Sequence, residues 1–432
     1  MLRRKEELPE TENVDQEWNA MKKVITEEAI QVCGIKKALK PACRETWWWS
    51  EEVQAAVRKK RQDYKRLKQN NSEEAKRKYK ASKNEAKRAV AKARAKCSEK
   101  FYQDLDSREG QKRIFRVAKA RNRVKRDTGD VAVIQDIDGI VLTEESEIRE
   151  RWKEYFGQLL NTENEREELE NIEKTEGPER CISSEEVEKA LKQMSKAKAA
   201  GPSGVTSEMF RALGRDGIQW LTKLLNRLLE EETIPEDWRK STMIPIYKAK
   251  GNVLDCGNYR GIKLLEHGLK VYERIIDKRL RQQVNIDDMQ FGFMPGKGTV
   301  DAIFILRQRQ EKMLEGNKMM YTAFIDLEKA YDRVPREVLY WCLRKRSVTE
   351  KMVRVIQSLY YGGQTIVQCS AGDTDPIPVA VGLHQGSALS PLLFTIFVMD
   401  TISATVREGV PDELLYADDI VISADSVDKL QK

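Results

Sequence analysis

The feature that most limits how this chain can fold is the uneven distribution of its charge. Between Arg58 and Arg126 the sequence holds 27 lysines and arginines against 8 aspartates and glutamates, a local charge of +19. Because the whole chain carries +7, the remaining residues together carry −12. Such a contrast indicates that one segment contacts a polyanion while the rest folds as an ordinary, mildly acidic domain.

The basic segment is predicted to be helical. Residues 51–126 are mostly alanine, lysine, arginine and glutamate, strong helix formers, and contain no proline. Apolar residues such as Val53, Val57, Tyr64 and Leu67 recur at roughly helical spacing, which indicates a thin apolar stripe. Two interpretations are open, a solvated helical linker or a nucleic-acid-binding arm whose cations displace counterions from phosphates. The charge favours the second, with these candidate contacts: Arg58, Lys59, Lys60, Arg61, Arg121, Arg123, Lys125 and Arg126.

Composition excludes several other classes of protein. At 432 residues the chain is long enough for two or three domains, and no run of 18 apolar residues that could span a membrane occurs. Its start lacks the apolar core of a secretory signal. The seven cysteines are scattered without a CxxC pair, and there are only two histidines. Neither a disulfide framework nor a zinc site is indicated, and a reducing compartment fits best.

Four segments are predicted along the chain. Residues 1–50 form a helical leader, 51–126 the basic helical segment, 127–180 a hairpin, a helix and an acidic linker, and 181–432 the main domain. The hairpin turns at Asp138-Gly139, because Asp-Gly favours such turns.

Helices and strands interleave in the main domain without a regular β-α-β rhythm, so an α+β fold is predicted. Ser183 and Glu186 form a capping-box signature at a helix start. Apolar helical faces and strand-like runs recur in this order: Trp220–Leu229, Ser241–Tyr247, Leu269–Leu280, Val300–Phe304, Met319–Ile325, Thr365–Cys369 and Leu414–Ile422.

Carboxylates lie against apolar strands at two places. One strand ends at Asp326, and the chain then turns into a helix near Pro335. At Asp418-Asp419 an acidic pair has apolar strand residues on both sides, which suits a tight hairpin with both carboxylates at the turn. An Asp-Asp pair alone says little, since Asp287-Asp288 lies in a polar loop of the same chain.

Adjacent charges against apolar strands are costly unless a cation compensates them. Phosphoryl transfer with two metal ions makes this demand, because ions about 3.5–4 Å apart hold the attacking and the leaving oxygens. Magnesium in polymerase sites is held by one or two carboxylates plus substrate phosphates. Three aspartates from two strands are therefore enough.

Three segments give these carboxylates a family context. They are Phe324-Ile-Asp-Leu-Glu-Lys-Ala-Tyr-Asp-Arg-Val-Pro335, Gly382-Leu-His-Gln-Gly-Ser-Ala-Leu-Ser-Pro391 and Tyr416-Ala-Asp-Asp419. In this order they resemble motifs A, B and C of reverse transcriptases. With Tyr259-Arg-Gly-Ile-Lys-Leu-Leu265 and Gln290-Phe-Gly-Phe-Met-Pro-Gly296 upstream, the chain is similar to enzymes of non-LTR, LINE-type retrotransposons, closest to the RTE group.

The resemblance implies a role for individual residues. Asp326, Asp418 and Asp419 would be catalytic metal ligands, with the Leu327 carbonyl a further candidate. Tyr331 would lie under the incoming sugar and leave no room for a 2′-hydroxyl; from the residues alone it is a core tyrosine after a strand.

Gln385 and Gly386 would lie near the nucleotide and template, Gly386 because it lets backbone approach closely. Lys248 and Arg260 would offer cations to the triphosphate, although Lys248 is also explained as a surface residue. The loop Gly201–Val205 resembles an early loop of the family in which aspartate usually stands at the position of Ser203.

By this resemblance the fold has the fingers and palm of a right-hand polymerase. Because only residues 420–432 follow Asp419, the thumb is expected to be absent and the chain to be a fragment truncated after motif C. The implied cofactors are two Mg²⁺ ions, with Mn²⁺ as a substitute, and the implied partners are an RNA template, a DNA primer and dNTPs, with no membrane. The family implies a nuclear location. A catalytically inactive nucleic-acid-binding remnant is the alternative function.

Overall fold

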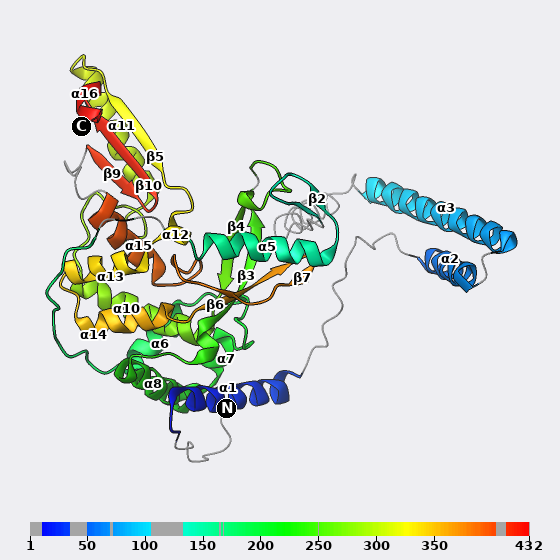
Figure 1. Cartoon of the computed structure of the whole chain (residues 1–432), viewed down its shortest axis with the longest axis horizontal. Helices are drawn as coiled ribbons and strands as arrows, with labels where there is room; N and C mark the ends of the chain where they lie inside the picture. The colour runs from blue at the N-terminus through cyan, green and yellow to red at the C-terminus, as the bar shows by residue number, and fades with distance from the viewer. Residues whose placement is uncertain are drawn as a thin grey trace. The chain divides into compact units, whose positions relative to one another are not determined.

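The computed structural model describes residues 11–34, 50–69, 72–104, 133–163, 166, 168–248, 250–402 and 412–431, and gives only the backbone for residues 69, 94–104 and 402. The chain divides into two compact units (Figure 1). The smaller is Gly34–Gly129, and the larger combines Met1–Cys33 with Asp130–Lys432. The basic segment is thus inserted, along the chain, into the larger unit, whereas the sequence predicted separate segments at 1–50 and 51–126.

The smaller unit is a pair of basic helices, α2 (Glu51–Gln69) and α3 (Glu73–Asp104). They run antiparallel, because the Tyr64 ring lies 5.3 Å from that of Tyr79, while Lys59, five residues earlier, pairs with Glu85 at 2.9 Å. Val53 is 1% exposed. The predicted helices with a thin apolar stripe are confirmed for the described residues.

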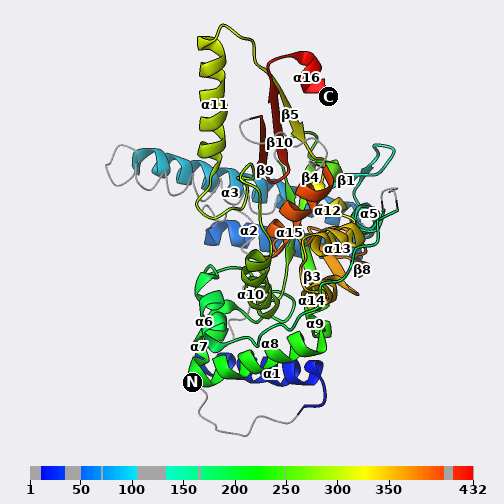
Figure 2. The same ribbon diagram turned by 90° about the vertical axis from the view of Figure 1, so that its left-hand side faces the viewer.

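Helix α1 (Val14–Cys33) belongs to the larger unit. Its buried residues Trp18, Met21 and Ile25 form a stripe at helical spacing within the main hydrophobic core. Figure 2 shows α1 alongside α8 (Gly214–Glu231), and Arg227 of α8 donates to the Thr11 carbonyl at 2.9 Å.

The larger unit contains further helices and helical turns. They are α5 (Glu145–Leu159), α6 (Ser184–Gln193), α7 (Ser207–Ala212), α9 (Glu236–Arg239), α10 (His267–Gln283), α11 (Thr299–Glu315), α12 (Ala330–Arg333), α13 (Arg336–Lys345), α14 (Glu350–Tyr360), α15 (Ser390–Phe397), the π-helical turn Val398–Ile402 and α16 (Val427–Gln431). Ser183 and Glu186 form the predicted capping box at the start of α6.

A five-stranded sheet contains β3 (Lys240–Tyr247), β4 (Tyr259–Leu264), β6 (Gln364–Cys369), β7 (Gly372–Asp373) and β8 (Ile377–Pro378). β3 pairs antiparallel with β4 and parallel with β6. Trp152 and Phe156 of α5 share a buried apolar cluster with Met243 of β3 and Tyr259 of β4. The predicted hairpin is formed by β1 (Ile134–Gln135) and β2 (Val141–Leu142).

A second sheet of three strands has the order β5-β10-β9, with bounds Tyr321–Asp326, Asp419–Ala424 and Glu413–Tyr416. Both of its strand pairs are antiparallel. Helices and sheets therefore combine as the predicted α+β fold. Within the described ranges, no helix is both long and apolar enough to cross a membrane.

The predicted apolar helical face Val300–Phe304 lies in α11, but no residue of α11 is buried. Ile303 is 53% exposed and Phe304 61%. Periodicity shows which face of a helix is apolar, but it does not show whether another element covers that face.

Candidate active site

Three aspartates meet at one end of the three-stranded sheet. Asp326 is the last residue of β5, and Ala417 and Asp418 form the turn between β9 and β10. Asp419 begins β10 and pairs directly with Asp326 on one side and with Tyr416 on the other. The predicted tight hairpin with both carboxylates at its turn is confirmed.

The electrostatics of this group favour a cation. Directly paired residues of an antiparallel sheet point to the same face, so Asp419 and Asp326 present like charges side by side. Burial raises the pKa of Asp419, and the carboxylates of Asp418 and Asp326 raise it further. A positive ion would relieve this repulsion.

The acidic turn is held by residues that the sequence analysis quoted without assigning a role. The amide oxygen of Gln290, a fully buried residue, accepts from Gly292 N at 2.7 Å and from Ala417 N at 3.3 Å. A Cβ on Gly292 would lie 2.4 Å from Ala417 N. Ala417 itself has φ 58°, the left-handed conformation that the turn requires. The turn is therefore fixed by close backbone packing.

These carboxylates fit a metal whose remaining ligands come from elsewhere. Among the described residues, no group of three or more histidine, cysteine, aspartate or glutamate side chains is arranged to hold an ion by itself. Magnesium in polymerase sites takes one or two carboxylates and completes its octahedron with waters and substrate phosphates. The donor set here, aspartates on the exposed end of a sheet, suits that mode. Leu327 follows directly, with its side chain packed against the main core.

Tyr331 lies next to this group, in α12. Its ring stacks on Phe394 of α15, with centroids 4.4 Å apart and an interplanar angle of 19°. Burial raises the pKa of Tyr331, and the charge of Asp418 raises it further, so the phenol and this carboxylate are neighbours. Its hydroxyl is buried without a protein partner among the described residues. Tyr331 therefore combines a packed ring with a position beside the carboxylates.

Gln385 lies in the loop Gly382–Ser387 that leads to α15. Its side-chain nitrogen donates to Asp332 at 2.7 Å, and its backbone carbonyl accepts from Lys263 N at 3.0 Å. Gly386 has φ 109°, and a Cβ there would lie 2.8 Å from the Lys263 carbonyl. The close backbone approach expected of Gly386 is thus made to β4 within this chain.

Lys248 and Arg260 are exposed on the β3–β4 hairpin. In the register of the two strands, Arg260 pairs with Ile246. Lys263 of β4, whose backbone touches Gln385, faces the opposite side. The structure therefore gathers Gln385, Tyr331 and the aspartates, while Arg260 projects from the other face of its strand relative to Lys263.

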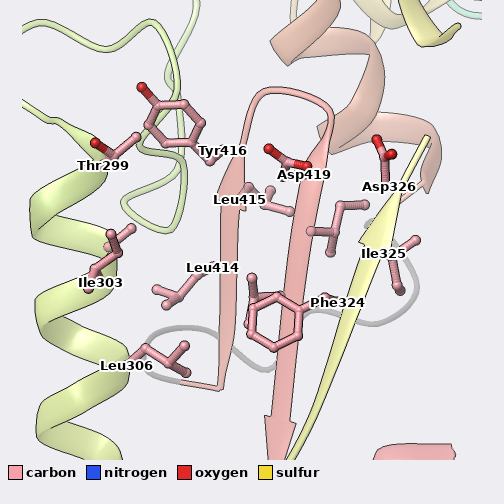
Figure 3. Close-up of a pocket in the computed structure, with 13 residues that line it drawn as sticks. Thr299, Ile303, Leu306, Phe324, Ile325, Asp326, Leu414, Leu415, Tyr416 and Asp419 are labelled. Carbon is pink, nitrogen blue, oxygen red and sulfur yellow. The ribbon is translucent and has the colours of Figure 1, made fainter. Parts of the chain in front are cut away.

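A groove of about 400 Å³ adjoins the carboxylates. Figure 3 shows Thr299, Ile303 and Leu306 of α11 on one side of it, with Asp326 and Asp419 at neighbouring strand ends. Except for the two aspartates, its lining is mostly apolar.

Ser203, which stands where the family usually has aspartate, has a defined partner. Its backbone nitrogen and its hydroxyl each donate to a different oxygen of Glu266, both at 2.6 Å. Glu266 is 0% exposed and stands at the N-terminal end of α10. The Gly201–Val205 loop is therefore anchored on α10.

The candidate nucleic-acid contacts fall into two groups. Arg58, Lys59 and Arg61 are exposed on α2 and Lys60 is half-buried; the Lys59 ammonium pairs with Glu85. The other four lie outside the described residues: Arg121, Arg123, Lys125 and Arg126.

Two buried charges next to Gln385 were missed by the sequence analysis. Lys263 is 2% exposed and Asp332 is 8% exposed. Burial lowers the pKa of Lys263 to about 7, the nearby Arg336 lowers it too, and Asp332 opposes both. The available signal was a lysine at an inward-facing position of the strand Tyr259–Leu264.

Comparison with known proteins agrees with the motifs. Residues 246–432 match the family described as reverse transcriptase (RNA-dependent DNA polymerase). A probable RNA-directed DNA polymerase from transposon BS of Drosophila melanogaster is 27% identical over 276 residues, 61% of this chain and 30% of that protein. The RNA-directed DNA polymerase from mobile element jockey of the same fly is 27% identical over 253 residues, 57% and 28% of the two chains.

A longer alignment reaches the N-terminal part of the chain. The Pol polyprotein of the type-1 retrotransposable element R1 of Bradysia coprophila is 26% identical over 359 residues, 81% of this chain and 34% of that protein. The chain thus spans about a third or less of the length of these relatives. The order of the motifs, the meeting of the three aspartates and these relatives agree, and together they support a LINE-type reverse transcriptase of a non-LTR retrotransposon.

Proposed function

We propose that this chain catalyses RNA-directed DNA synthesis, extending a DNA primer 3′-hydroxyl with dNTPs on an RNA template. The observation that carries the proposal is the meeting of Asp326, Asp418 and Asp419 at one sheet end, where burial and then the neighbouring like charges raise the pKa of Asp419. This arrangement is costly for folding and useful for binding cations. Membership of the RTE group and a nuclear location stay predictions.

The three aspartates would hold two Mg²⁺ ions, or Mn²⁺, which supply charge stabilisation for the attacking and leaving oxygens. Beside them, the packed ring of Tyr331 is a rigid surface that can exclude a 2′-hydroxyl. Gln385 presents a polar group to the same region, and the exposed Lys248 and Arg260 are available to triphosphate oxygens. Fixed cations stabilise the charge that gathers on leaving pyrophosphate.

The basic helices add an independent binding function. Exposed cations on α2 and α3 form a phosphate-binding surface for RNA or DNA without sequence preference. Binding to Arg58, Lys60 and Arg61 is tested by changing all three to Gln. The matched control changes three exposed lysines of the larger unit, Lys223, Lys278 and Lys345.

Loss of three phosphate contacts should lower the slope of log K against log salt by about 2–3 for duplex DNA. The control triple variant should keep the wild-type slope. Equal slopes in all three proteins would show that α2 does not contact phosphate.

Polymerase activity is tested by primer extension on poly(rA)/oligo(dT) with Mg²⁺, beside an RNA gel shift. Asp418→Asn should abolish extension and keep RNA binding, because it removes a metal ligand and leaves the basic helices intact. The control is Asp287→Asn with Asp288→Asn, the second acidic pair of the chain, which should extend like wild type.

The two outcomes separate polymerase from the alternative function. A wild-type chain that binds RNA and extends nothing would be the catalytically inactive remnant. Extension that survives Asp418→Asn would contradict the assignment of the carboxylates.

A further inference from the structure

The loop Gly382–Ser387 is fixed on several sides by backbone contacts. Gly382 N donates to the Val334 carbonyl at 2.9 Å and Leu383 N to the Tyr331 carbonyl at 2.7 Å. A Cβ on Gly382 would lie 2.5 Å from the Asp332 carbonyl oxygen. The loop therefore packs against α12 and Val334, which follow β5, the strand that carries Asp326.

Helices α10 and α13 also bind the loop. Ser387 Oγ donates to Glu273 of α10 at 2.7 Å, and Ala388 N donates to the same carboxylate at 3.0 Å. Arg336 of α13 donates to the Gly382 carbonyl at 3.2 Å. These contacts fix the backbone of the loop, and the direction of the Gln385 side chain requires a further contact.

Asp332 supplies that contact. Its carboxylate accepts a hydrogen bond from Gln385 Nε2 at 2.7 Å. A carboxylate only accepts, so the amide nitrogen must face Asp332 and the amide oxygen must face away from it. One carboxylate therefore determines both the rotamer of Gln385 and which end of its amide is free.

The surroundings act on the Asp332 carboxylate in opposite directions, and burial has the largest effect. Burial raises the pKa of Asp332, while the charge of Lys263 and the hydrogen bond from Gln385 lower it, with smaller contributions from Lys329 and Lys248. The nearby ammonium and the amide donor favour the anion and so oppose the effect of burial, while either protonation state leaves an oxygen that can accept from Gln385 Nε2. Lys263 thus supports the same geometry from β4, through its charge and through its backbone bond to the Gln385 carbonyl.

We propose that Asp332 is a positioning residue that orients the Gln385 amide, with its oxygen free to meet a hydrogen-bond donor of the bound nucleotide or template. Asp332 acts through Gln385 and does not itself touch substrate. The part of the proposal that concerns substrate rests on the polymerase function proposed above.

The experiment uses the full chain with Asp332→Ala, Asp332→Asn, Gln385→Ala and the Asp332→Ala/Gln385→Ala double variant. The amide introduced by Asp332→Asn still offers an oxygen to Gln385, so it is the conservative replacement. Glu350→Ala is the matched control, because Glu350 is also a buried carboxylate (2% exposed) but pairs with Arg344 on another side of the core.

The first measurement needs no activity. In protein labelled with ¹⁵N-glutamine, the Gln385 side-chain amide is the resonance that disappears in Gln385→Ala. It should move to the position of exposed glutamines in Asp332→Ala, stay nearly in place in Asp332→Asn and be unchanged in Glu350→Ala. If the chemical shift of this amide is the same in Asp332→Ala as in wild type, the proposal is wrong, whether or not the chain polymerises.

The second measurement is steady-state primer extension. Asp332→Ala should raise KM for dNTP about fivefold, the value of one ordinary hydrogen bond, with a smaller change in kcat. Asp332→Asn should keep KM close to the wild-type value. In the Gln385→Ala background, Asp332→Ala should cause no further increase in KM.

A purely structural role has a different signature. Asp332→Ala would then lower the active fraction and Tm as Glu350→Ala does, leave KM unchanged and act additively with Gln385→Ala. That result would contradict the proposal. A wild-type chain that extends no primer would contradict the polymerase function instead, and the amide resonance would still decide how Gln385 is oriented.

Discussion

Replacing Ser203 by Asp, the residue usual in the family, should destabilise this chain at neutral pH. In the structure Ser203 donates two hydrogen bonds to Glu266, both at 2.6 Å, and Glu266 is completely buried. An aspartate here would remove the hydroxyl donor and place a second carboxylate against the first. A substitution that restores the family pattern should therefore be harmful in this sequence.

The magnitude follows from two comparisons. Ser203→Ala loses one hydrogen bond to a charged group, about 1.5–3 kcal/mol. In Ser203→Asp, two carboxylates about 4 Å apart repel by about 4 kcal/mol at an effective dielectric constant of 20. Protonation of one carboxyl limits this cost, since holding a proton three pH units above a pKa near 4 also costs about 4 kcal/mol.

The cost of Ser203→Asp should therefore depend on pH. Burial already raises the pKa of Glu266, while the hydrogen bonds from Ser203 lower it. Once the introduced carboxylate replaces the hydroxyl donor, the pair takes up a proton, and the destabilisation should shrink by about 1.4 kcal/mol for each unit that the pH falls from 7 towards 5. Ser203→Ala contains no new titrating group, so its cost should change less.

Urea unfolding followed by tryptophan fluorescence measures these differences, with Trp220 and Trp238 buried in the same unit. Glu266→Gln is the decisive partner variant, because a glutamine amide can donate to the introduced aspartate. Ser203→Asp combined with Glu266→Gln should be more stable at pH 7 than Ser203→Asp alone. Equal stability of wild type and Ser203→Asp at pH 7, or no rescue by Glu266→Gln, would refute this account of the loop.

Four further predictions concern the site and the core. Gly292→Ala should reduce primer extension at least tenfold with the fold retained by circular dichroism, because its Cβ would lie 2.4 Å from Ala417 N and the acidic turn would have to move. Tyr331→Val should admit ribonucleotides and leave dNTP use largely intact; kcat/KM for dCTP against CTP measures this, and unchanged discrimination would make Tyr331 a core residue only. Burial lowers the pKa of His384 well below its usual value, so the unfolded chain binds the proton first and stability falls as the pH drops below about 6.5. In wild type this effect lowers the free energy of unfolding by up to about 1.4 kcal/mol as the pH falls from 6.5 to 5.5. His384→Phe should lack this decrease, and urea unfolding of both proteins at the two pH values measures it. Asp419→Asn should raise Tm without metal, because burial and the carboxylates of Asp418 and Asp326 raise the pKa of Asp419 and so disfavour its charge, which the substitution removes. A lowered Tm would contradict this reasoning.

The sequence predicted the elements of the fold better than their packing. Helices α8 and α10, strands β3, β5 and β6, and the β9–β10 hairpin lie where apolar periodicity and turn residues put them. Periodicity is a local property, so it could not show that α1 belongs to the same compact unit as residues beyond 130. The stripe Trp18–Ile25 is amphipathic in the sequence, but its partners lie about 200 residues away.

For the candidate site, too, residues in local motifs could be predicted and long-range contacts could not. Asp326, Asp418 and Asp419 could be singled out because the segments that carry them resemble motifs A and C in order, whereas an acidic pair alone says little. Asp332 and Lys263 were not, since each is explained singly as a surface charge, and only the tertiary structure shows that both are buried beside Gln385. Long-range pairing of buried charges leaves no local pattern.

Around the candidate active site, a tightly fixed backbone surrounds carboxylates that repel one another. The loop of Gln385 and the acidic turn are each fixed by backbone bonds and by close glycine contacts, at Gly382 and Gly292. Asp326 and Asp419 lie exposed at one end of the three-stranded sheet, directly paired and with like charges. Conflicts of this kind persist in natural proteins where function requires them and the surroundings hold them in place. The rigid backbone around the carboxylates is thus the physical condition that lets an unfavourable charge cluster remain in the geometry that metal ions and nucleotide would use.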